Sequence, residues 1–148
     1  MKSLCKGLLT GLLLSSISVC SFAGNEDPLV GKWKTIDDET GKPKSIVEIY
    51  ERSGKIYGKV VDILDAEKKK NLCTKCPGED KNKPVMGLVI IKGLTKDGNE
   101  YSSGKILDPV TGKTYKCFLA LEGSDQLKVR GFIGISLFGR TQTWHRVK

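Results

Sequence analysis

Residues 114–121 have the sequence Thr-Tyr-Lys-Cys-Phe-Leu-Ala-Leu, and this stretch decides the fold class. Its odd-numbered positions place four apolar or aromatic side chains on one face of an extended chain: Tyr115, Cys117, Leu119 and Leu121. A period of two is typical of a β-strand that has one face in a core and the other toward solvent. The stretch therefore predicts an amphipathic strand.

The chain after residue 28 repeats this character in short segments separated by turns. Eight segments alternate in polarity or are rich in β-branched and aromatic residues, and we expect each to be a strand. They are residues 31–36, 45–52, 55–64, 87–95, 100–108, 114–121, 126–132 and 139–147. A helical stripe of ten or more residues is absent from the sequence, and only residues 65–70 predict a single helical turn, capped by Asp65.

Eight short antiparallel strands must either close into a barrel or stack as two sheets. Closure removes exposed strand edges, and a barrel of this size holds one small ligand or only its own side chains. Residues 37–42 and 108–113 share the pattern D-x-x-T-G-K. We interpret both as hairpin turns, in which Asp accepts backbone amide hydrogens and Gly takes a positive φ. The sequence thus predicts an all-β fold, a small antiparallel barrel of about eight strands.

Residues 1–23 have the features of a signal peptide. A positively charged start is followed by an apolar run at residues 8–19 and by Ser-Phe-Ala at residues 21–23, which suits a signal peptidase. The apolar run is short for a membrane span. Lipidation at Cys20 is an alternative, but Val19 is bulky where a lipoprotein signal has a small residue.

Residues 24–148 are then expected to form a single domain without a transmembrane segment. Only Lys2 and Lys6 are lost from the 25 basic residues of the chain, so 23 basic and 17 acidic residues remain, a net charge of +6. Together with export to the periplasm or beyond, this charge favours an anionic envelope partner over nucleic acid. The single histidine, His145, excludes chemistry built on several histidines. The sequence also has no phosphate-binding loop and no G-x-S-x-G motif.

Three cysteines follow residue 23. Cys73 and Cys76 form a C-x-x-C-P sequence, and in an oxidising compartment we expect a disulfide between them. Cys117 lies on the apolar face of its strand and is expected to be a buried free thiol. Two alternatives remain open: a redox-active C-x-x-C site, and a zinc site completed by Cys117 and His145. Pro77 stands where covalent haem attachment needs a histidine, and we expect neither a cofactor nor a metal.

Gly31-Lys32-Trp33, in the first expected strand, resembles the G-x-W start of lipocalin-like barrels. That resemblance implies that Trp33 plugs one end of the barrel and is covered by a basic side chain from the last strand. Arg140 and Arg146 both lie in that strand, so either could cover it. An ordinary core tryptophan is the alternative.

Longer motifs extend the resemblance to the whole chain after the signal peptide. They are Ile-Leu-Asp-Pro at 106–109, Thr-Gly-Lys-Thr-Tyr at 111–115, Arg-Gly-Phe-Ile-Gly at 130–134 and Phe-Gly-Arg-Thr-Gln-Thr-Trp at 138–144. With the G-x-W motif and Tyr57-Gly58 they resemble the domain of unknown function 2147 family of exported bacterial proteins, over residues 29–147. The resemblance implies a small lipocalin-like (calycin-type) barrel in the envelope. It implies no activity and therefore no catalytic residue.

Three functional hypotheses follow. The first is a non-enzymatic barrel that binds a small apolar or amphipathic ligand, lined by inward-facing Val47, Ile49, Tyr115, Leu119, Leu121 and Val129. The same side chains could instead fill the barrel completely. The second is an envelope protein-interaction module with an exposed apolar patch at residues 131–138. The third is a C-x-x-C thiol-disulfide oxidoreductase.

Overall fold

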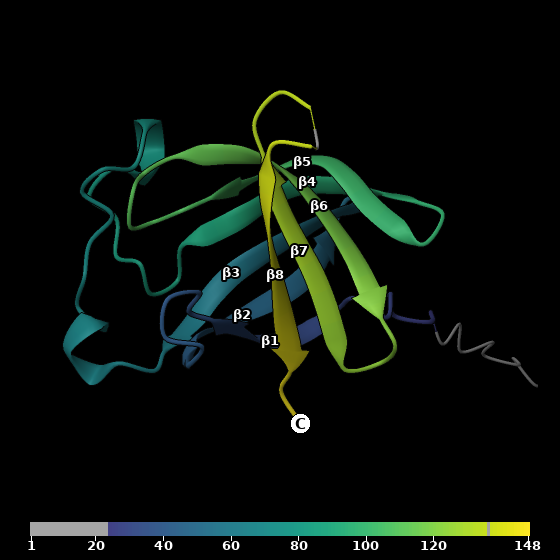
Figure 1. The fold of residues 1–148 in the computed structure, drawn as a ribbon, viewed down its shortest axis with the longest axis horizontal. Coiled ribbons are helices and arrows are strands. Elements are labelled where there is room, and N and C mark those ends of the chain that lie inside the picture. The colour runs from purple at the N-terminus through teal and green to yellow at the C-terminus, as the bar shows by residue number, and fades with distance from the viewer. Residues whose placement is uncertain (1–23, 136) are drawn as a thin grey trace, which may run out of the picture.

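The structure is a computed structural model that describes residues 24–135 and 137–148 (Figure 1). The predicted signal peptide, residues 1–23, lies outside the described residues. Within them, eight antiparallel strands close into a barrel in which each strand pairs with its neighbours in chain order. They are β1 (Gly31–Ile36), β2 (Pro43–Arg52), β3 (Lys55–Ile63), β4 (Val89–Asp97), β5 (Glu100–Leu107), β6 (Thr114–Glu122), β7 (Gln126–Phe132) and β8 (Gly139–Arg146). The predicted all-β barrel is confirmed.

The helical content of the described residues is two short 3₁₀ helices. Both η1 (Ala66–Lys68) and η2 (Gly78–Asp80) lie in the long connection between β3 and β4. The side chain of Asp65 accepts a hydrogen bond from the backbone amide of Glu67 and so caps η1. The predicted single helical turn is therefore present, and its cap is Asp65.

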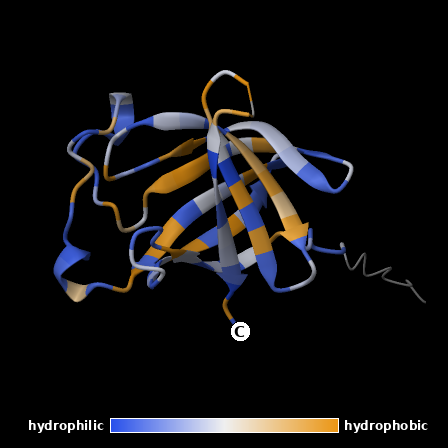
Figure 2. Ribbon diagram, in the orientation of Figure 1, coloured by the Kyte–Doolittle hydropathy of each residue, from blue (hydrophilic) through white to orange (hydrophobic). Residues whose placement is uncertain are grey.

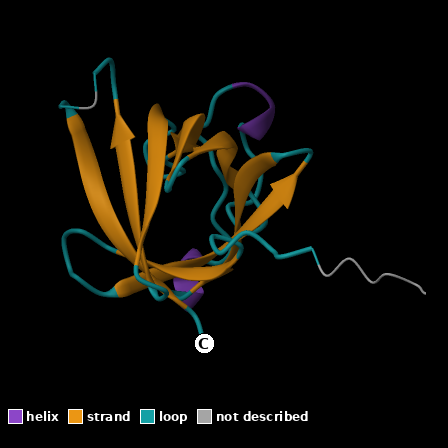
Figure 3. Ribbon diagram, turned by 90° about the vertical axis from the view of Figure 1, so that its right-hand side faces the viewer, coloured by secondary structure: helices purple, strands orange, loops and turns teal. Residues whose placement is uncertain are grey.

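Because successive strands run in opposite directions, their connections gather at two ends of the barrel (Figures 1 and 3). We call one the plug end: it carries the start of β1, the end of β8 and the hairpins after β2, β4 and β6. The other is the loop end, which carries the connections after β1, β3, β5 and β7.

The core fills the barrel between these ends. In Figure 2 hydrophobic and hydrophilic residues alternate along β7. Leu127 and Val129 are buried members of this strand. Corresponding positions on the other strands supply further buried side chains: Trp33, Val47, Ile49, Ile56, Val60, Ile91, Leu94, Tyr101, Cys117, Leu119 and Trp144. Burial of apolar area on this scale is the main stabilising contribution to the fold.

The ring closes along a short seam. Strands β1 and β8 pair through Trp33 with Arg146 and through Lys34 with His145. By contrast, β7 and β8 pair along their whole length, from Gln126 with His145 to Phe132 with Gly139. The backbone amide of Val147 adds one hydrogen bond to the carbonyl of Lys32, at 2.9 Å.

Candidate functional site

Trp33 closes the plug end. Its side chain is fully buried, and its indole Nε1–H donates a hydrogen bond to the carbonyl of Leu29 at 2.9 Å. The guanidinium carbon of Arg146 lies 4.2 Å from the centroid of the Trp33 ring, within the range of a cation–π contact. The indole therefore has a hydrogen-bond partner, and its face is covered by a cation from the last strand.

Arg146 is fixed by three backbone carbonyls. Its Nε donates to Ser124 at 2.8 Å, Nη1 to Val30 at 3.2 Å and Nη2 to Pro28 at 2.6 Å. Arg140, the other candidate for this role, lies at the loop end and pairs with Asp38. The two arginines are six residues apart on β8, which is about 20 Å of extended chain. Arg140 is therefore not part of the plug.

A carboxylate ties the segment before β1 to the barrel wall. Asp27 accepts hydrogen bonds from the hydroxyl of Tyr101 and from the backbone amide of Leu29, and its other oxygen lies 3.1 Å from the Lys96 ammonium. Burial acts to raise the pKa of Asp27, but these hydrogen bonds and the Lys96 charge outweigh it and hold the pKa below its usual value. Burial and the Asp27 hydrogen bond raise the pKa of Tyr101.

The six predicted ligand-lining residues are not equivalent in the structure. Val47, Ile49 and Leu119 are 0% exposed, and Val129 is 3% exposed. A side chain that lines a ligand-sized cavity keeps surface that a water molecule can reach, and these four have almost none. They are packed core residues, whereas Tyr115 and Leu121 are half-buried near opposite ends of the barrel. In this part of the interior the side chains therefore fill the barrel.

Polar side chains follow the packed core toward the loop end. The hydroxyls of Thr35 and Ser45 lie 2.7 Å apart and share a hydrogen bond. The side chain of Gln142 donates to Asp38 and accepts from the indole nitrogen of Trp144 at 3.0 Å. This group could not be predicted from the sequence, because its members come from different parts of the chain and only the strand register brings them together.

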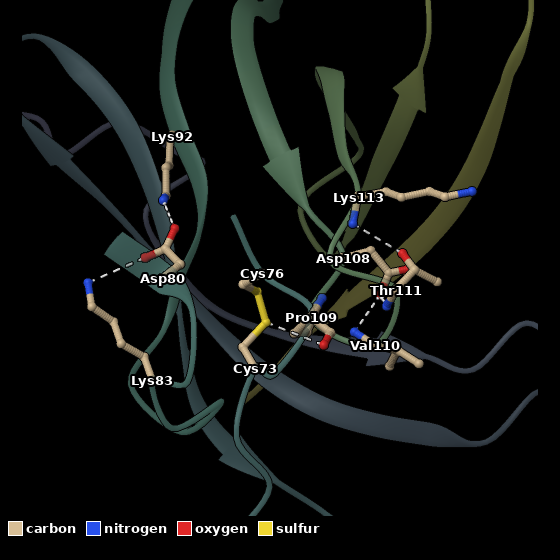
Figure 4. The surroundings of a disulfide bond; sticks show 10 residues. All are labelled: Cys73, Cys76, Asp80, Lys83, Lys92, Asp108, Pro109, Val110, Thr111 and Lys113. Carbon is tan, nitrogen blue, oxygen red and sulfur yellow. Dashed lines mark hydrogen bonds and ion pairs between the residues drawn. A yellow bond between two sulfur atoms is a disulfide. The ribbon is translucent and has the colours of Figure 1, made fainter. Parts of the chain in front are cut away.

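Cys73 and Cys76 are bonded to each other, with their Cα atoms 5.3 Å apart, as Figure 4 shows. The bond packs against the turn after β5, where the Cys73 Sγ lies 3.4 Å from the carbonyl oxygen of Pro109. Gly112 of that turn is so close to the connection that a Cβ atom there would lie 1.9 Å from the Lys75 carbonyl oxygen. The disulfide therefore fixes the connection against the barrel wall.

This geometry does not suit the redox or zinc alternatives. A thioredoxin-type cysteine is accessible and starts a helix that lowers its pKa. Here Cys73 and Cys76 are 0% and 2% exposed, and η2 has only three residues. Among residues 24–135 and 137–148, no group of three or more His, Cys, Asp or Glu side chains converges on a possible metal position. His145 is exposed on β8, and burial raises the pKa of the Cys117 thiol to about 12.

Two pockets, of about 390 and 370 Å³, lie on the outer wall and share Glu79, Asp80 and Lys92 as lining residues. Asp80 is paired with both Lys83 and Lys92 (Figure 4). The larger pocket is bordered by the stacked rings of Tyr50 and Tyr57, whose centroids are 5.7 Å apart. Neither pocket includes any of the six predicted ligand-lining residues.

The loop between β7 and β8 carries several of the exposed large apolar side chains of the described residues. Four of them form what we call the apolar tip: Ile133, Ile135, Leu137 and Phe138, which are 66%, 58%, 79% and 73% exposed. The loop projects beyond the strands at the loop end of the barrel (Figures 1 and 3). These residues belong to the predicted patch at 131–138, whereas Gly131 and Phe132 are half-buried in β7.

The closed barrel, its tryptophan plug and its covering arginine define a lipocalin-like barrel protein. Protein HP1028 from Helicobacter pylori, described as belonging to the lipocalin family, matches with a TM-score of 0.72 and 27% identity, over 81% of this chain and 83% of that one. The chain belongs to the DUF2147 family, "Uncharacterized protein conserved in bacteria", whose profile matches residues 31–146. The predicted family is thus confirmed.

A redesigned β-barrel has a weaker structural match, with a TM-score of 0.46 and 17% identity, over 82% of this chain and 92% of that one. No curated protein matches the chain at a significant level. Within the part of the chain that the structure describes, no helix has the length and apolar character needed to cross a membrane.

Proposed function

We propose that this protein is a non-enzymatic binding module of the bacterial envelope and that it binds through the apolar tip. The exposure of the four tip side chains is the observation that carries the proposal. Large apolar side chains that cluster on a polar surface mark interaction sites, because moving them from water into a contact lowers the free energy. The envelope location rests on the predicted signal peptide.

The packed interior supports a surface function over an internal one. Val47, Ile49 and Leu119 have no exposed surface in the barrel, and both pockets lie on its outer wall. A ligand could enter only if these side chains moved apart, which would cost their packing energy. The tip, by contrast, is available without any rearrangement.

A sedimentation experiment tests the proposal. The exported protein is mixed with washed envelope membranes from its own host, and the bound fraction is measured for the wild type and for a tip variant with Ile133→Ser, Ile135→Ser, Leu137→Ser and Phe138→Ser. The matched control replaces three exposed apolar residues away from the tip: Leu64→Ser, Leu72→Ser and Val110→Ser. We expect the tip variant to lose binding and the control to keep it. Equal binding of all three proteins would contradict the proposal.

A small-ligand carrier is the second candidate. Its support is the structural likeness to HP1028, a protein described as belonging to the lipocalin family. Native mass spectrometry of the protein purified from its own host tests it. A carrier would retain a bound small molecule, whereas a packed barrel would have only the mass of its chain.

A further inference from the structure

We propose that the apolar tip inserts into the surface of an anionic lipid bilayer. This inference rests on the proposed function and names the partner.

The β7–β8 hairpin is entirely free of acidic residues. From Gln126 to Lys148 the sequence contains no Asp or Glu, while it contains five basic residues: Lys128, Arg130, Arg140, Arg146 and Lys148. Arg130 and Arg140 lie toward the tip, whereas Lys128, Arg146 and Lys148 lie toward the plug end, where Lys128 pairs with Glu122 and Lys148 with Asp125. Cations beside exposed apolar side chains are attracted to anionic headgroups while the apolar side chains enter the acyl boundary. Charge and hydrophobicity therefore favour the same occupant.

Three cations lie next to the tip. The Lys116 ammonium is 3.5 Å from the carbonyl oxygen of Gly134, within the loop itself. Arg130 donates a hydrogen bond to the hydroxyl of Thr141 at 2.6 Å, on the strands that carry the loop. Arg140 lies there too, with its charge partly offset by Asp38. Among these groups the three cations outnumber the one carboxylate, Asp38.

Two backbone hydrogen bonds link described residues of the loop. The amide of Ile133 donates to the carbonyl of Phe138 at 3.3 Å, and the amide of Phe138 donates to the carbonyl of Ile135 at 3.1 Å. At the base of the hairpin, a Cβ atom on Gly139 would lie 2.6 Å from the Gly131 carbonyl oxygen. Glycine thus allows the two strands to pair up to the loop, which projects from the barrel (Figure 3).

The size of the tip favours a bilayer over a protein. A stable protein–protein interface uses roughly 20–30 residues on each side. The tip offers four side chains on a narrow loop, which is too small a surface for such an interface. A lipid surface needs no complementary pocket, and insertion gains free energy from the apolar side chains alone.

Flotation with lipid vesicles tests the inference. The chain from residue 24 onward is mixed with vesicles of equal parts phosphatidylcholine and phosphatidylglycerol, or of phosphatidylcholine alone. We expect binding to the anionic vesicles and little binding to the neutral ones. The four-serine tip variant should bind at least about tenfold more weakly. Thermal unfolding of that variant confirms that the barrel is still folded.

A matched pair of charge variants tests the electrostatic part. Lys116→Gln, beside the tip, should weaken binding to the anionic vesicles by about fivefold. Lys55→Gln removes an exposed lysine at the plug end and should change binding little. Phe138→Trp adds a reporter at the tip, and its emission should shift to shorter wavelength on the anionic vesicles.

The outcomes separate the two proposals. If the protein ignores anionic vesicles but binds envelope membranes through the tip, the partner is a protein: this inference is overturned while the proposed function stands. If the envelope membranes also bind the wild type and the tip variant equally, both fail. Binding to anionic vesicles that the tip variant retains would assign the contact to another surface and overturn the inference.

Discussion

Trp33 and Arg146 form a plug in which the indole nitrogen and each guanidinium nitrogen donate a hydrogen bond. The indole nitrogen donates to Leu29, and the guanidinium donates to three carbonyls from two different loops while its face lies over the ring. A buried polar atom without a partner would cost free energy, so this arrangement lets a large side chain end the core without that cost. The plug therefore joins the segment before β1 to the last strand at one end of the barrel.

Replacing Trp33 by Ala should lower the free energy of unfolding by about 3–5 kcal/mol, because it removes a fully buried ring and leaves a cavity. Denaturant unfolding of the chain from residue 24 onward measures the loss. An unchanged midpoint would show that the plug contributes no stability.

The two arginines of β8 provide a control. Arg146→Ala removes three backbone hydrogen bonds and the cover over Trp33, so it should also destabilise clearly. Arg140 is 68% exposed and forms a surface ion pair, so Arg140→Ala should change stability by less than about 1 kcal/mol. Equal losses from both variants would contradict the assignment of the plug to Arg146.

Asp27 should make stability depend on pH in the acid range. Its pKa is lower in the folded protein than in the unfolded chain, so the folded state favours the ionised form. The resulting stabilisation is present above the unfolded pKa of about 3.9 and is lost as the pH falls through the folded value. Asp27→Asn should therefore cost about 1–3 kcal/mol at neutral pH, with the difference from wild type shrinking below about pH 4.

Denaturant unfolding of both proteins between neutral pH and about pH 3 tests this dependence. Asp37→Asn offers a comparison, because Asp37 also has a lowered pKa but lies in the exposed turn after β1. A difference between wild type and Asp27→Asn that stays constant with pH would exclude an ionised Asp27 as the source of the stabilisation.

At the scale of elements, the β3–β4 connection depends on a disulfide that contacts a neighbouring turn. The Cys73 sulfur lies against Pro109, and Gly112 leaves room for the backbone at Lys75. The second D-x-x-T-G-K turn therefore supports this connection in addition to joining β5 to β6. The first such turn has no comparable neighbour: the position of Gly41 is open on all sides.

The cysteines should differ in reactivity. Without reductant, alkylation should label no thiol in the folded protein and one, Cys117, after unfolding, because burial shields that thiol and raises its pKa to about 12. Replacing Cys73 and Cys76 by Ser should lower the free energy of unfolding by about 1–3 kcal/mol, since the closed loop is short. Three thiols labelled after unfolding of the exported protein would mean that the pair is reduced.

The barrel could be predicted from the sequence because its strands are local patterns. Alternation in residues 114–121 and 126–132 and the turn residues between them fix β6 and β7 without any distant information. Strand ends were harder to predict: β2 begins at Pro43, two residues before the predicted segment, because its first residues pair with β1. Alternation of polarity can be read within one segment, whereas pairing between strands depends on two segments.

The candidate site was only partly predictable for the same reason. The exposed loop at residues 131–138 was visible as an apolar run between two strands. Whether Val47 or Leu119 lines a cavity depends on side chains from the opposite wall, which the sequence does not place. Asp27 was missed because its partner, Tyr101, lies more than seventy residues away and pairs with it only in the closed barrel.

At the scale of the whole molecule, the two ends have opposite character. The plug end is tied together by hydrogen bonds from Arg146 and Asp27, while the loop end carries the exposed apolar tip. A protein that binds a bilayer by the tip would therefore hold its plug end away from the lipid. Any molecule that the barrel exchanged with the membrane would pass through the loop end.

The short pairing between β1 and β8 can form only after β8, the last strand, has been synthesised. β1 is among the first parts of the domain to be synthesised, yet the residues that pair with it, His145 and Arg146, are among the last. Until they are available, β1 and β7 each present an open edge beside an apolar face, and such edges join copies of a chain to one another. The edge of β1 is therefore open to self-association from the time this strand is made until β8 has followed β7.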